Sequence, residues 1–523
     1  MFSCRQNPSQ TEIAEGIRTM VKESEYGSGL VSVYADNDFK PIWVRNGGVK
    51  KSGKDYFEEL EDVLFDGLEK SNYLSEKQAG LLEKIKESKD PLVHAALDIA
   101  LSNSFLELAS DLNIGRVDPA AIHTGWKMAR KIPTANYEKI LLSVAEGESV
   151  KEGLDQLRPN NPMYTELRSL LRKRLAESTE ETEPVRLFEG KIEKGDRHAE
   201  IPAIRRKLLF LEDLRTNLKG EGELYDEELF HAVKKFQKRH GLINDGVIGS
   251  DFLAAINYSP SDIVAKIKVN LERLRWLPDF IDTEKDKVIV NIPDFHLFYL
   301  QGTDTVFTSK VVVGREYRKT PVFEADMTYL VFNPTWTLPE TILWKDVIPS
   351  IQKNIDYLKR NNMEVLDTQE RKIDSNEIDW DELNDKEDFP YLIRQAPGKE
   401  NPLGKIKFML PNEYAIYIHD TPAQGHFSRD ERALSSGCIR MEHPEKFAAL
   451  LLEGVEDWDE EKIAEHMDLD EEKKVDLNKA RKVWILYFTI WDQEGNLEVR
   501  QDLYGMDRKL AEALALPQSE YFL

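Results

Sequence analysis

Cys438 and His419 are the two residues of this 523-residue chain whose types and spacing could support nucleophilic catalysis. Cys438 lies in the sequence SSGCIR, and His419 follows the apolar stretch IYI nineteen residues earlier. Because a free cysteine ionises only near pH ~8.5, its thiol becomes a competent nucleophile when a base takes its proton or an imidazolium holds it as thiolate. The pair is therefore typical of acyl transfer. From spacing alone, a buried structural cysteine beside an unrelated histidine is an equally open interpretation.

The residues around this pair add to the chemistry. Ser435, Ser436 and Gly437 permit a sharp turn before Cys438, and such a turn can aim successive backbone N–H groups at one point, as an oxyanion hole requires. A period of two places Tyr417 on the same side of its strand as His419.

Other candidate sites are weaker. We expect His426 to face solvent in a connecting loop, and His443 follows the motif just before a proline. The chain has no H-E-x-x-H motif, no paired-cysteine spacing and no glycine-rich phosphate loop, so the sequence implies no metal and no organic cofactor.

Length and composition bound the possibilities. At roughly 150 residues per domain, the chain should form two to four domains. The 95 acidic and 71 basic residues give a net charge of −24, which argues against a nucleic-acid or anionic-membrane binder. No uninterrupted apolar stretch reaches the ~18 residues of a membrane helix; we interpret the best candidate, Val483–Trp491, as a buried strand. Two cysteines are too few for a disulfide scaffold.

The N-terminal third offers no catalytic residue types. Residues 1–10 should be a disordered tail without the charged and apolar regions of a signal peptide. Cys4, after a small residue, resembles the mature start of a bacterial lipoprotein and could carry a lipid anchor in the outer or inner membrane; a chance cysteine is the alternative. Residues 11–185 should form a mainly helical scaffold domain, with a small hairpin over Leu30–Tyr34 and Pro41–Val44.

Residues 186–260 form the next predicted unit. Helical patterns cover Ile201–Leu211, a segment from Asp226 to Gly241, and Asp251–Asn257. The sequence FHAVKKFQKRHGLINDGVIG, which starts at Phe230, resembles the peptidoglycan-binding repeat of cell-wall hydrolases, a small three-helix module. A spacer helix bundle is the alternative. The middle helix also carries four basic residues, which suit an anionic wall polymer: Lys234, Lys235, Lys238 and Arg239.

Strand patterns dominate residues 261–510, and residues 511–523 should be a C-terminal tail. The segment 339–387 interrupts the strands; it is helical at first and then strongly acidic. Because both of its ends must return to one β-core, we expect a mobile lid over the cysteine site. A fixed subdomain is the alternative.

The sequence from His419 to SSGCIR resembles the signature of YkuD-type L,D-transpeptidases. Further segments resemble the large YcbB-like subgroup: VNLERLRWLP, FNPTWTLP, RQAPG, NPLGKIKF and IHDTP. The order of a helical scaffold, a peptidoglycan-binding module and a β-rich YkuD domain fits as well, giving a multidomain α+β protein. The chain departs from many relatives in having Ser436 where they have a histidine, which leaves His419 as the motif histidine available as a base.

The resemblance implies a cysteine acyltransferase of the bacterial cell wall, located in the periplasm or cell envelope and acting in wall biogenesis and cell shape. Cys438 would attack a donor tetrapeptide stem, with His419 as base, and an acceptor stem would complete a 3→3 cross-link. It also implies carbapenem-type inhibitors. An L,D-carboxypeptidase or amidase that passes the same acyl-enzyme to water is the alternative, and a non-catalytic wall-binding scaffold is a weaker one.

The same resemblance assigns roles to individual residues. The carbonyl of Asp420 would orient the imidazole, and the backbone N–H groups of Ser436, Gly437 and Cys438 would hold the oxyanion. The expected substrate-binding residues are Arg440, Tyr417, Trp336 and Ser435. Arg440 suits a substrate carboxylate because its guanidinium is a planar bidentate donor.

Overall fold

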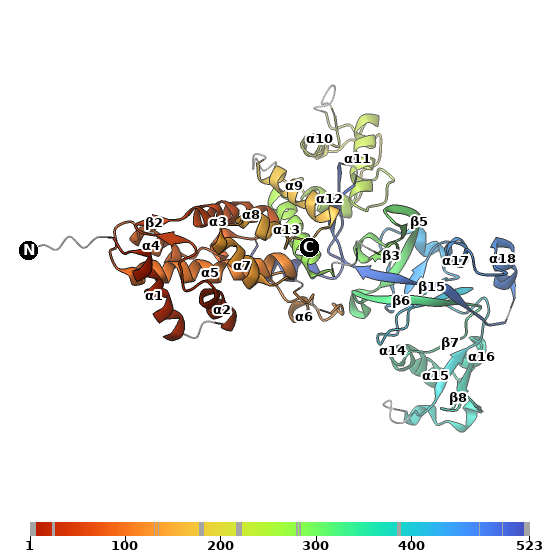
Figure 1. The fold of residues 1–523 in the computed structure, drawn as a ribbon. Coiled ribbons are helices and arrows are strands. Elements are labelled where there is room, and N and C mark those ends of the chain that lie inside the picture. The colour runs from red at the N-terminus through yellow and green to blue at the C-terminus, as the bar shows by residue number, and fades with distance from the viewer. Residues whose placement is uncertain are drawn as a thin grey trace, which may run out of the picture.

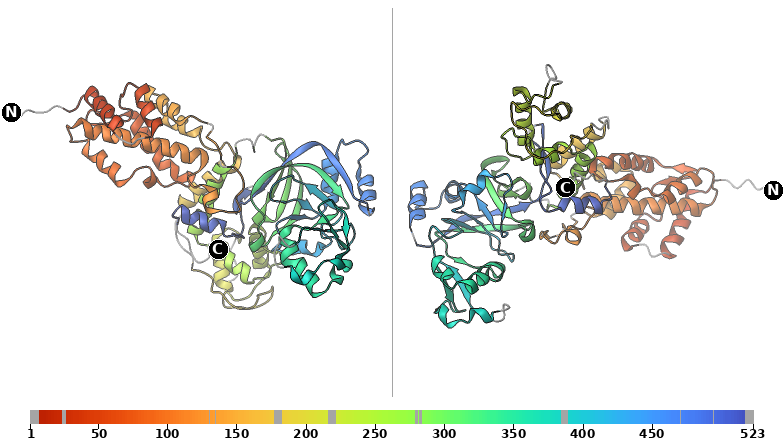
Figure 2. Two further views of the ribbon diagram at one scale, coloured as in Figure 1. Left: turned by 90° about the horizontal axis from the view of Figure 1, so that it is seen from below. Right: turned by 180° about the vertical axis from the view of Figure 1, so that it is seen from behind.

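The computed structural model describes residues 7–23, 27–129, 131–133, 135–176, 183–215, 222–278, 281, 284–383, 389–469, 471–493 and 495–516. A helical domain lies at one end and a β-rich domain at the other, with a small helical module beside their junction (Figure 1). The same separation is visible from below and from behind (Figure 2). The predicted multidomain α+β class is confirmed. Cys4, the candidate lipid-anchor residue, lies outside the described residues.

The N-terminal domain is helical, as predicted, but the expected hairpin is wrong. Leu30–Tyr34 lies in a helix because Leu30, Val33 and Tyr34 form a buried stripe at helical spacing. Only a two-residue strand, β1 (Val44–Arg45), follows, and it pairs with β2 (Gly48–Val49). The described helices of this domain are α1 (Gln10–Glu23), α2 (Ser28–Asp36), α3 (Lys51–Asp62), α4 (Glu76–Lys84), α5 (Pro91–Ile114), α6 (Pro119–Ile122), α7 (Tyr137–Glu146), α8 (Val150–Asp155) and α9 (Pro162–Ala176).

The central helix of this domain is α5. It starts with Pro91 in its first turn, and the side chain of Asp90 accepts the N–H of Leu92 at 2.9 Å. By length and composition α5 could cross a membrane, yet most of it is buried against its neighbours. The buried carboxylate of Asp98 accepts the backbone N–H groups of residues 42–44 at 2.7–2.9 Å. These bonds make α5 the core helix of a packed domain.

The small module contains the three predicted helices, α10 (Ile201–Phe210), α11 (Glu227–Arg239) and α12 (Ser250–Ile256). They enclose a hydrophobic core of their own. Asn257 fastens the two ends of the module, since its side-chain amide exchanges hydrogen bonds of 2.8 and 2.9 Å with the backbone of Val185.

Two further helices join the domains. Helix α13 (Pro260–Trp276) contacts α5 and α9 of the helical domain, and α19 (Met506–Ala513) packs on α13. The buried carboxylate of Asp507 in α19 pairs with Lys266 at 3.0 Å and with Arg273 at 2.5 Å, both in α13. The expected tail over 511–523 is therefore wrong as far as residue 516, because Ala511 and Leu516 are buried.

The β-rich domain is one closed sheet. The strand order is β13-β5-β14-β12-β11-β6-β15-β3-β4, and a further pairing of β4 with β5 closes the sheet on itself. Its strands are β3 (Asp286–Asn291), β4 (His296–Gln301), β5 (Asp304–Gly314), β6 (Phe323–Phe332), β11 (Ile406–Met409), β12 (Ile418–His419), β13 (Ala433–Ser435), β14 (Ile439–Met441) and β15 (Lys473–Leu486).

The predicted strand Val483–Trp491 is two strands. Strand β15 ends at Leu486, and β16 (Ile490–Gln493) pairs with β17 (Asn496–Val499) in a separate hairpin. The chain changes direction at Thr489, whose N–H and hydroxyl are bound by Asn270 and Asp507 of the joining helices.

The interruption of the strand series is a subdomain with its own four-stranded sheet. Its strands lie in the order β7-β10-β8-β9, with bounds β7 (Trp336–Thr337), β8 (Met363–Leu366), β9 (Lys372–Ile373) and β10 (Leu392–Gln395). Helices α15 (Ile348–Lys353) and α16 (Asp356–Arg360) follow a π-helical turn at Leu343–Val347. Within the subdomain, Trp380 of the acidic half is buried against Phe389, with ring centroids 5.5 Å apart.

Candidate active site

The turn before Cys438 is held by side-chain hydrogen bonds. Gly437 has φ +120°, a conformation that favours glycine. The hydroxyl of Ser435 accepts the N–H of Gly437 at 3.1 Å and donates to the carbonyl of Cys438 at 2.6 Å. Thr320 donates to the carbonyl of Gly437 at 2.7 Å. These bonds fix the backbone on both sides of the sulfur.

Strand register brings four predicted site residues close together. Strand β12 runs parallel to β14, with His419 opposite Arg440, and the N–H of Ile439 donates to the carbonyl of Tyr417 at 3.0 Å. As register partners, His419 and Arg440 project to the same face. Tyr417 and Cys438 directly precede the two strands and contact each other, since the Tyr417 hydroxyl bonds the sulfur. The rings of Tyr417 and His419 lie 5.6 Å apart. Segments nineteen residues apart in the chain thus form one cluster.

The thiol of Cys438 is partly exposed and lies beside Tyr417. Its sulfur is 3.7 Å from the carbonyl oxygen of Ala415 and accepts hydrogen bonds from the backbone N–H and the hydroxyl of Tyr417. Burial raises the pKa of the thiol, and the nearby Lys407 and Arg440 oppose this shift only in part. The thiol is therefore protonated at neutral pH.

The imidazole of His419 is buried and oriented by the backbone. Its Nδ1 lies 2.5 Å from the carbonyl oxygen of Asp420. A carbonyl can only accept, so Nδ1 carries the proton and Nε2 keeps a lone pair. Burial, together with the charges of Arg440 and Lys407, lowers the pKa of His419 to about 3 despite the backbone carbonyls of Asp420 and Leu403. The imidazole is therefore neutral at neutral pH.

The thiol and the imidazole are therefore both neutral at neutral pH. A neutral thiol and a neutral imidazole favour proton transfer coupled to attack on a carbonyl.

Comparison with known families assigns the domain that carries this pair. Residues 285–459 match the L,D-transpeptidase catalytic domain, YkuD. The matched range contains both Cys438 and His419. Residues 197–256 match the "Putative peptidoglycan binding domain", and residues 28–171 match a scaffold domain. The predicted peptidoglycan-binding module is confirmed, and the order of the three units fits the YcbB-like subgroup.

A protein of Haemophilus influenzae named "Putative L,D-transpeptidase" is 36% identical to this chain over 250 residues. The match covers 48% of this chain and 50% of that protein, so it spans about half of each.

Two solved structures were also compared. An L,D-transpeptidase fragment from Xylanimonas cellulosilytica is 12% identical with a TM-score of 0.18, and the match covers 58% of this chain and all of that one. A fused zinc-dependent amidase/peptidase and peptidoglycan-binding protein from Clostridium acetobutylicum is 11% identical with a TM-score of 0.15; the match covers 57% of this chain and 99% of that one. Scores this low carry no argument.

The oxyanion-hole residues of the YkuD domain need one correction. The N–H of Gly437 is bound by the hydroxyl of Ser435, so it is not directed at a substrate. Ser435 itself is buried within the turn, where its hydroxyl binds the backbone of Gly437 and Cys438. Of the three N–H groups expected to hold the oxyanion, those of Ser436 and Cys438 are not bound by this hydroxyl.

Basic side chains lie near the cluster formed by Tyr417, His419, Cys438 and Arg440. Of these basic residues, only Arg440 was predicted from the sequence. Lys407 lies opposite His419 on β11, with its ammonium 4.0 Å from the centre of the Tyr417 ring. Burial, followed by the charge of Arg315, lowers the pKa of Arg440. The buried Nε of Arg440 has no protein hydrogen-bond partner. A carboxylate-bearing ligand would satisfy these groups.

The two histidines near the motif, His426 and His443, differ in exposure and in partners. His426 is partly buried rather than solvent-facing, and its Nδ1 lies 3.4 Å from the guanidinium of Arg440. His443 is exposed beside Glu445. Within the described ranges, no group of three or more His, Cys, Asp or Glu residues could hold a metal ion.

The inserted subdomain reaches the same cluster at two points. The indole N–H of Trp336 donates to the hydroxyl of Tyr417. Arg318 pairs with Asp346 of the π-helical turn at 2.7 Å and donates to the hydroxyl of Ser436 at 2.9 Å. Trp336 was expected to line the substrate site, and the structure places it one hydrogen bond from the residue beside the thiol.

Proposed function

We propose that this protein is an L,D-transpeptidase that forms 3→3 cross-links between peptidoglycan stems through an acyl-enzyme on Cys438. The observation that carries the proposal is the parallel pairing of β12 with β14, which brings Cys438 and an oriented, neutral His419 into one cluster. A YkuD domain and a peptidoglycan-binding domain in one chain support a peptidoglycan substrate.

In the first half-reaction, the sulfur of Cys438 attacks the carbonyl carbon between the L-centre of the third-position diamino acid and the fourth-position D-Ala. Nε2 of His419 takes the thiol proton as the carbon–sulfur bond forms. The N–H groups of Ser436 and Cys438 hold the negative oxygen. Collapse of the tetrahedral intermediate breaks the peptide bond, and the proton on His419 goes to the departing amine of D-Ala, leaving a thioester.

In the second half-reaction, the side-chain amine of an acceptor stem attacks the thioester carbonyl. His419 accepts a proton from the attacking amine and returns it to the sulfur of Cys438. An amide forms, the carbon–sulfur bond breaks, and the enzyme is regenerated. Arg440, with Arg315 nearby, would pair with stem carboxylates and keep the donor in register.

The decisive experiment is to incubate the full chain with a disaccharide-tetrapeptide and identify the products by mass. A cross-linked dimer with release of D-Ala supports the transpeptidase. Tripeptide monomer alone would instead assign the hydrolytic alternative, in which water takes the place of the acceptor amine. No product, with Cys438 intact, would contradict both.

We further propose that the protein works where this substrate is found, in the periplasm or cell envelope. It also predicts that carbapenems acylate Cys438, because they present a strained amide carbonyl to the same nucleophile.

A further inference from the structure

The loop between β5 and β6 lies beside the turn that precedes Cys438, and one hydroxyl connects the two. Gly314 ends β5, and Thr320 follows in the loop before β6. The buried hydroxyl of Thr320 accepts the N–H of Gly314 at 2.8 Å and donates to the carbonyl of Gly437 at 2.7 Å. The end of β5 is thereby tied to the residue before the nucleophile.

The hydrogen bond from Thr320 fixes the peptide unit that joins Gly437 to Cys438. In a trans peptide the C=O and the N–H point in opposite directions. Because the carbonyl of this unit faces Thr320, its N–H, which belongs to Cys438, faces the other way. The two hydrogen bonds of Ser435 hold the N–H of Gly437 and the carbonyl of Cys438, which belong to the flanking units. Since Gly437 has no Cβ to restrict rotation, Thr320 supplies the anchor for this unit.

Tyr504 holds Thr320 in place. Its buried hydroxyl donates to the carbonyl of Gly314 at 2.6 Å and accepts the N–H of Thr320 at 3.2 Å. Burial raises the pKa of this phenol to about 12, so it keeps its proton at neutral pH. The hydrogen bonds among Gly314, Thr320, Tyr504 and Gly437 therefore form one buried network.

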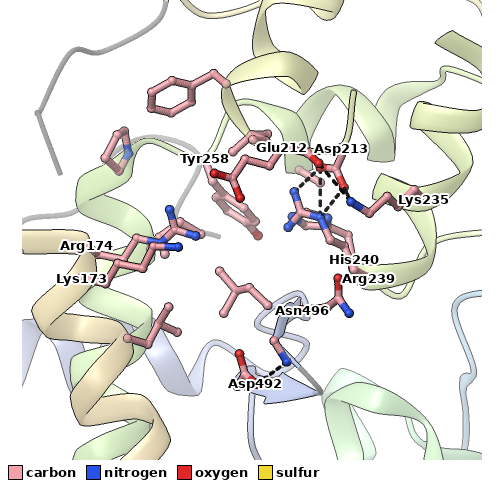
Figure 3. Close-up of a pocket in the computed structure, with 18 of the residues that line it drawn as sticks. Lys173, Arg174, Glu212, Asp213, Lys235, Arg239, His240, Tyr258, Asp492 and Asn496 are labelled. Atoms are coloured by element: carbon pink, nitrogen blue, oxygen red, sulfur yellow. Dashed lines mark hydrogen bonds and ion pairs between the residues drawn. The ribbon is translucent and has the colours of Figure 1, made fainter. Parts of the chain in front are cut away.

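The segment that carries Tyr504 comes from the junction of the domains. It follows the β16–β17 hairpin, whose Asp492 and Asn496 line a hollow of about 550 Å³ shared with α9 and the small module (Figure 3). The N–H of Tyr504 donates to the hydroxyl of Tyr487 at 2.8 Å, and that hydroxyl donates to Asp502 at 2.8 Å. Helix α19 then begins at residue 506 and packs on α13. Tyr504 thus reaches the loop from a well-bonded support.

We propose that Thr320 and Tyr504 are positioning residues for acyl transfer. Thr320 aims the N–H of Cys438 at the carbonyl oxygen that becomes negative in the tetrahedral intermediate, and Tyr504 holds Thr320 in that position. The hydrogen bond to the carbonyl of Gly437 also polarises the peptide unit, which makes its N–H a stronger donor. The inference rests on the proposed function for the identity of the acyl donor.

The test compares two reactions of the same thiol in the full chain. In acylation by p-nitrophenyl acetate, the sulfur bonds to the acetyl carbon through a tetrahedral intermediate with a negative oxygen, p-nitrophenolate leaves, and the thiol proton passes through His419 to solvent. In alkylation by iodoacetamide, the sulfur displaces iodide and no such oxygen forms. The first rate is measured by p-nitrophenolate absorbance and the second by protein mass, each after subtraction of the rate of Cys438→Ala.

Thr320→Val should lower the acylation rate about tenfold or more, since complete loss of one oxyanion donor costs ~100- to 1,000-fold. Alkylation should stay at the wild-type rate. Thr320→Ser keeps the hydroxyl and should restore acylation. Tyr504→Phe should also lower acylation selectively, by a smaller factor than Thr320→Val. The control is Tyr164→Phe, a buried tyrosine of α9 whose hydroxyl donates to Asp66 at 2.9 Å, and both of its rates should match wild type.

Two results would overturn the proposal. A parallel loss of acylation and alkylation in Thr320→Val would show that this residue only supports the fold of the turn. Wild-type acylation by Thr320→Val would show that the peptide unit needs no anchor. Circular dichroism establishes which variants fold. If Thr320→Val does not, Tyr504→Phe decides: a selective loss of acylation supports the proposal, and wild-type acylation contradicts it.

The outcome is separable from the proposed function, because the ester carries no stem peptide. Selective loss of acylation in the variants of a protein that forms no cross-linked product would remove only the transpeptidase assignment. Cross-linked product from the wild type, with unchanged acylation in Thr320→Val and Tyr504→Phe, would remove only this inference.

Discussion

The guanidinium of Arg318 donates a hydrogen bond of 2.9 Å to the hydroxyl of Ser436, in the turn that precedes Cys438. The same guanidinium holds Asp346 of the inserted subdomain at 2.7 Å. One side chain thus connects the subdomain to the backbone that supplies the proposed oxyanion donors. A second series of hydrogen bonds links the subdomain to the thiol. Trp336 donates to the hydroxyl of Tyr417, which in turn donates to the sulfur of Cys438.

Arg318→Ala should uncouple the subdomain from the turn. We expect kcat/KM for stem cross-linking to fall about tenfold, because a charge-assisted hydrogen bond contributes about 1.5–3 kcal/mol, reduced here by the exposure of Asp346. Alkylation of Cys438 by iodoacetamide should be unaffected. Arg360→Ala, an exposed arginine of the same subdomain, is the control. Equal kinetics for the two variants would show that the connection has no role.

Removing the subdomain tests whether it acts as a lid. Thr337 and Arg394 are paired across β7 and β10, so a short Gly/Ser linker can join them in place of residues 338–393. The fold should persist, because the subdomain has its own core. Cross-linking of natural stems should be impaired through loss of positioning, while thiol alkylation survives or accelerates. Unchanged cross-linking kinetics would identify a fixed subdomain without a lid function.

The neutral thiol and imidazole predict a simple pH profile for alkylation. The pKa of Cys438 is raised by burial, so the thiolate is scarce at neutral pH and its fraction should grow about tenfold per unit from pH 7 to 9. Because the pKa of His419 is about 3, no step near pH 6.5 is expected. Stopped-flow alkylation of the full chain measures this directly. A plateau already reached at pH 6–7 would indicate a preformed ion pair instead.

Tyr417→Phe removes a hydroxyl that donates to the sulfur and accepts from Trp336. Losing this bond should raise the pKa of the thiol further and lower kcat/KM about five- to tenfold, as expected for a hydrogen bond of about 1 kcal/mol. Tyr414→Phe is the matched control, since that hydroxyl contacts only the exposed Glu413 among the hydrogen bonds described for it. A Tyr417→Phe variant with wild-type kinetics and pH profile would leave the tyrosine with a packing role.

Sequence reasoning located Cys438 and His419 from their residue types, their spacing and a family signature, and strand periodicity then added Tyr417. The parallel pairing of β12 with β14 was not predicted. Sequence reasoning also could not find Arg318, whose contact with Ser436 crosses 118 residues and follows no local pattern. Ser435 was predicted to bind substrate. The motif gives its residue type, but it does not show that the hydroxyl accepts the N–H of Gly437. Leu30–Tyr34 was predicted as part of a hairpin but lies in a helix. A short apolar run fits both the strand period of two and the helical period of 3.6, and burial of one helical face in this domain favours the helix.

His419→Ala keeps the nucleophile but removes the base. Acylation by a tetrapeptide stem should slow ~100- to 10,000-fold, the usual contribution of general base catalysis. Rapid-quench measurement of D-Ala release gives the rate. A loss of less than tenfold would mean that another group takes the thiol proton.

The most direct test of the account is the mass of the protein after reaction with a carbapenem or a tetrapeptide stem, in wild type and in Cys438→Ala. The account predicts a single covalent adduct on wild type, mapped to the peptide that contains Cys438, and none on the variant. An adduct on Cys438→Ala at comparable yield would contradict it.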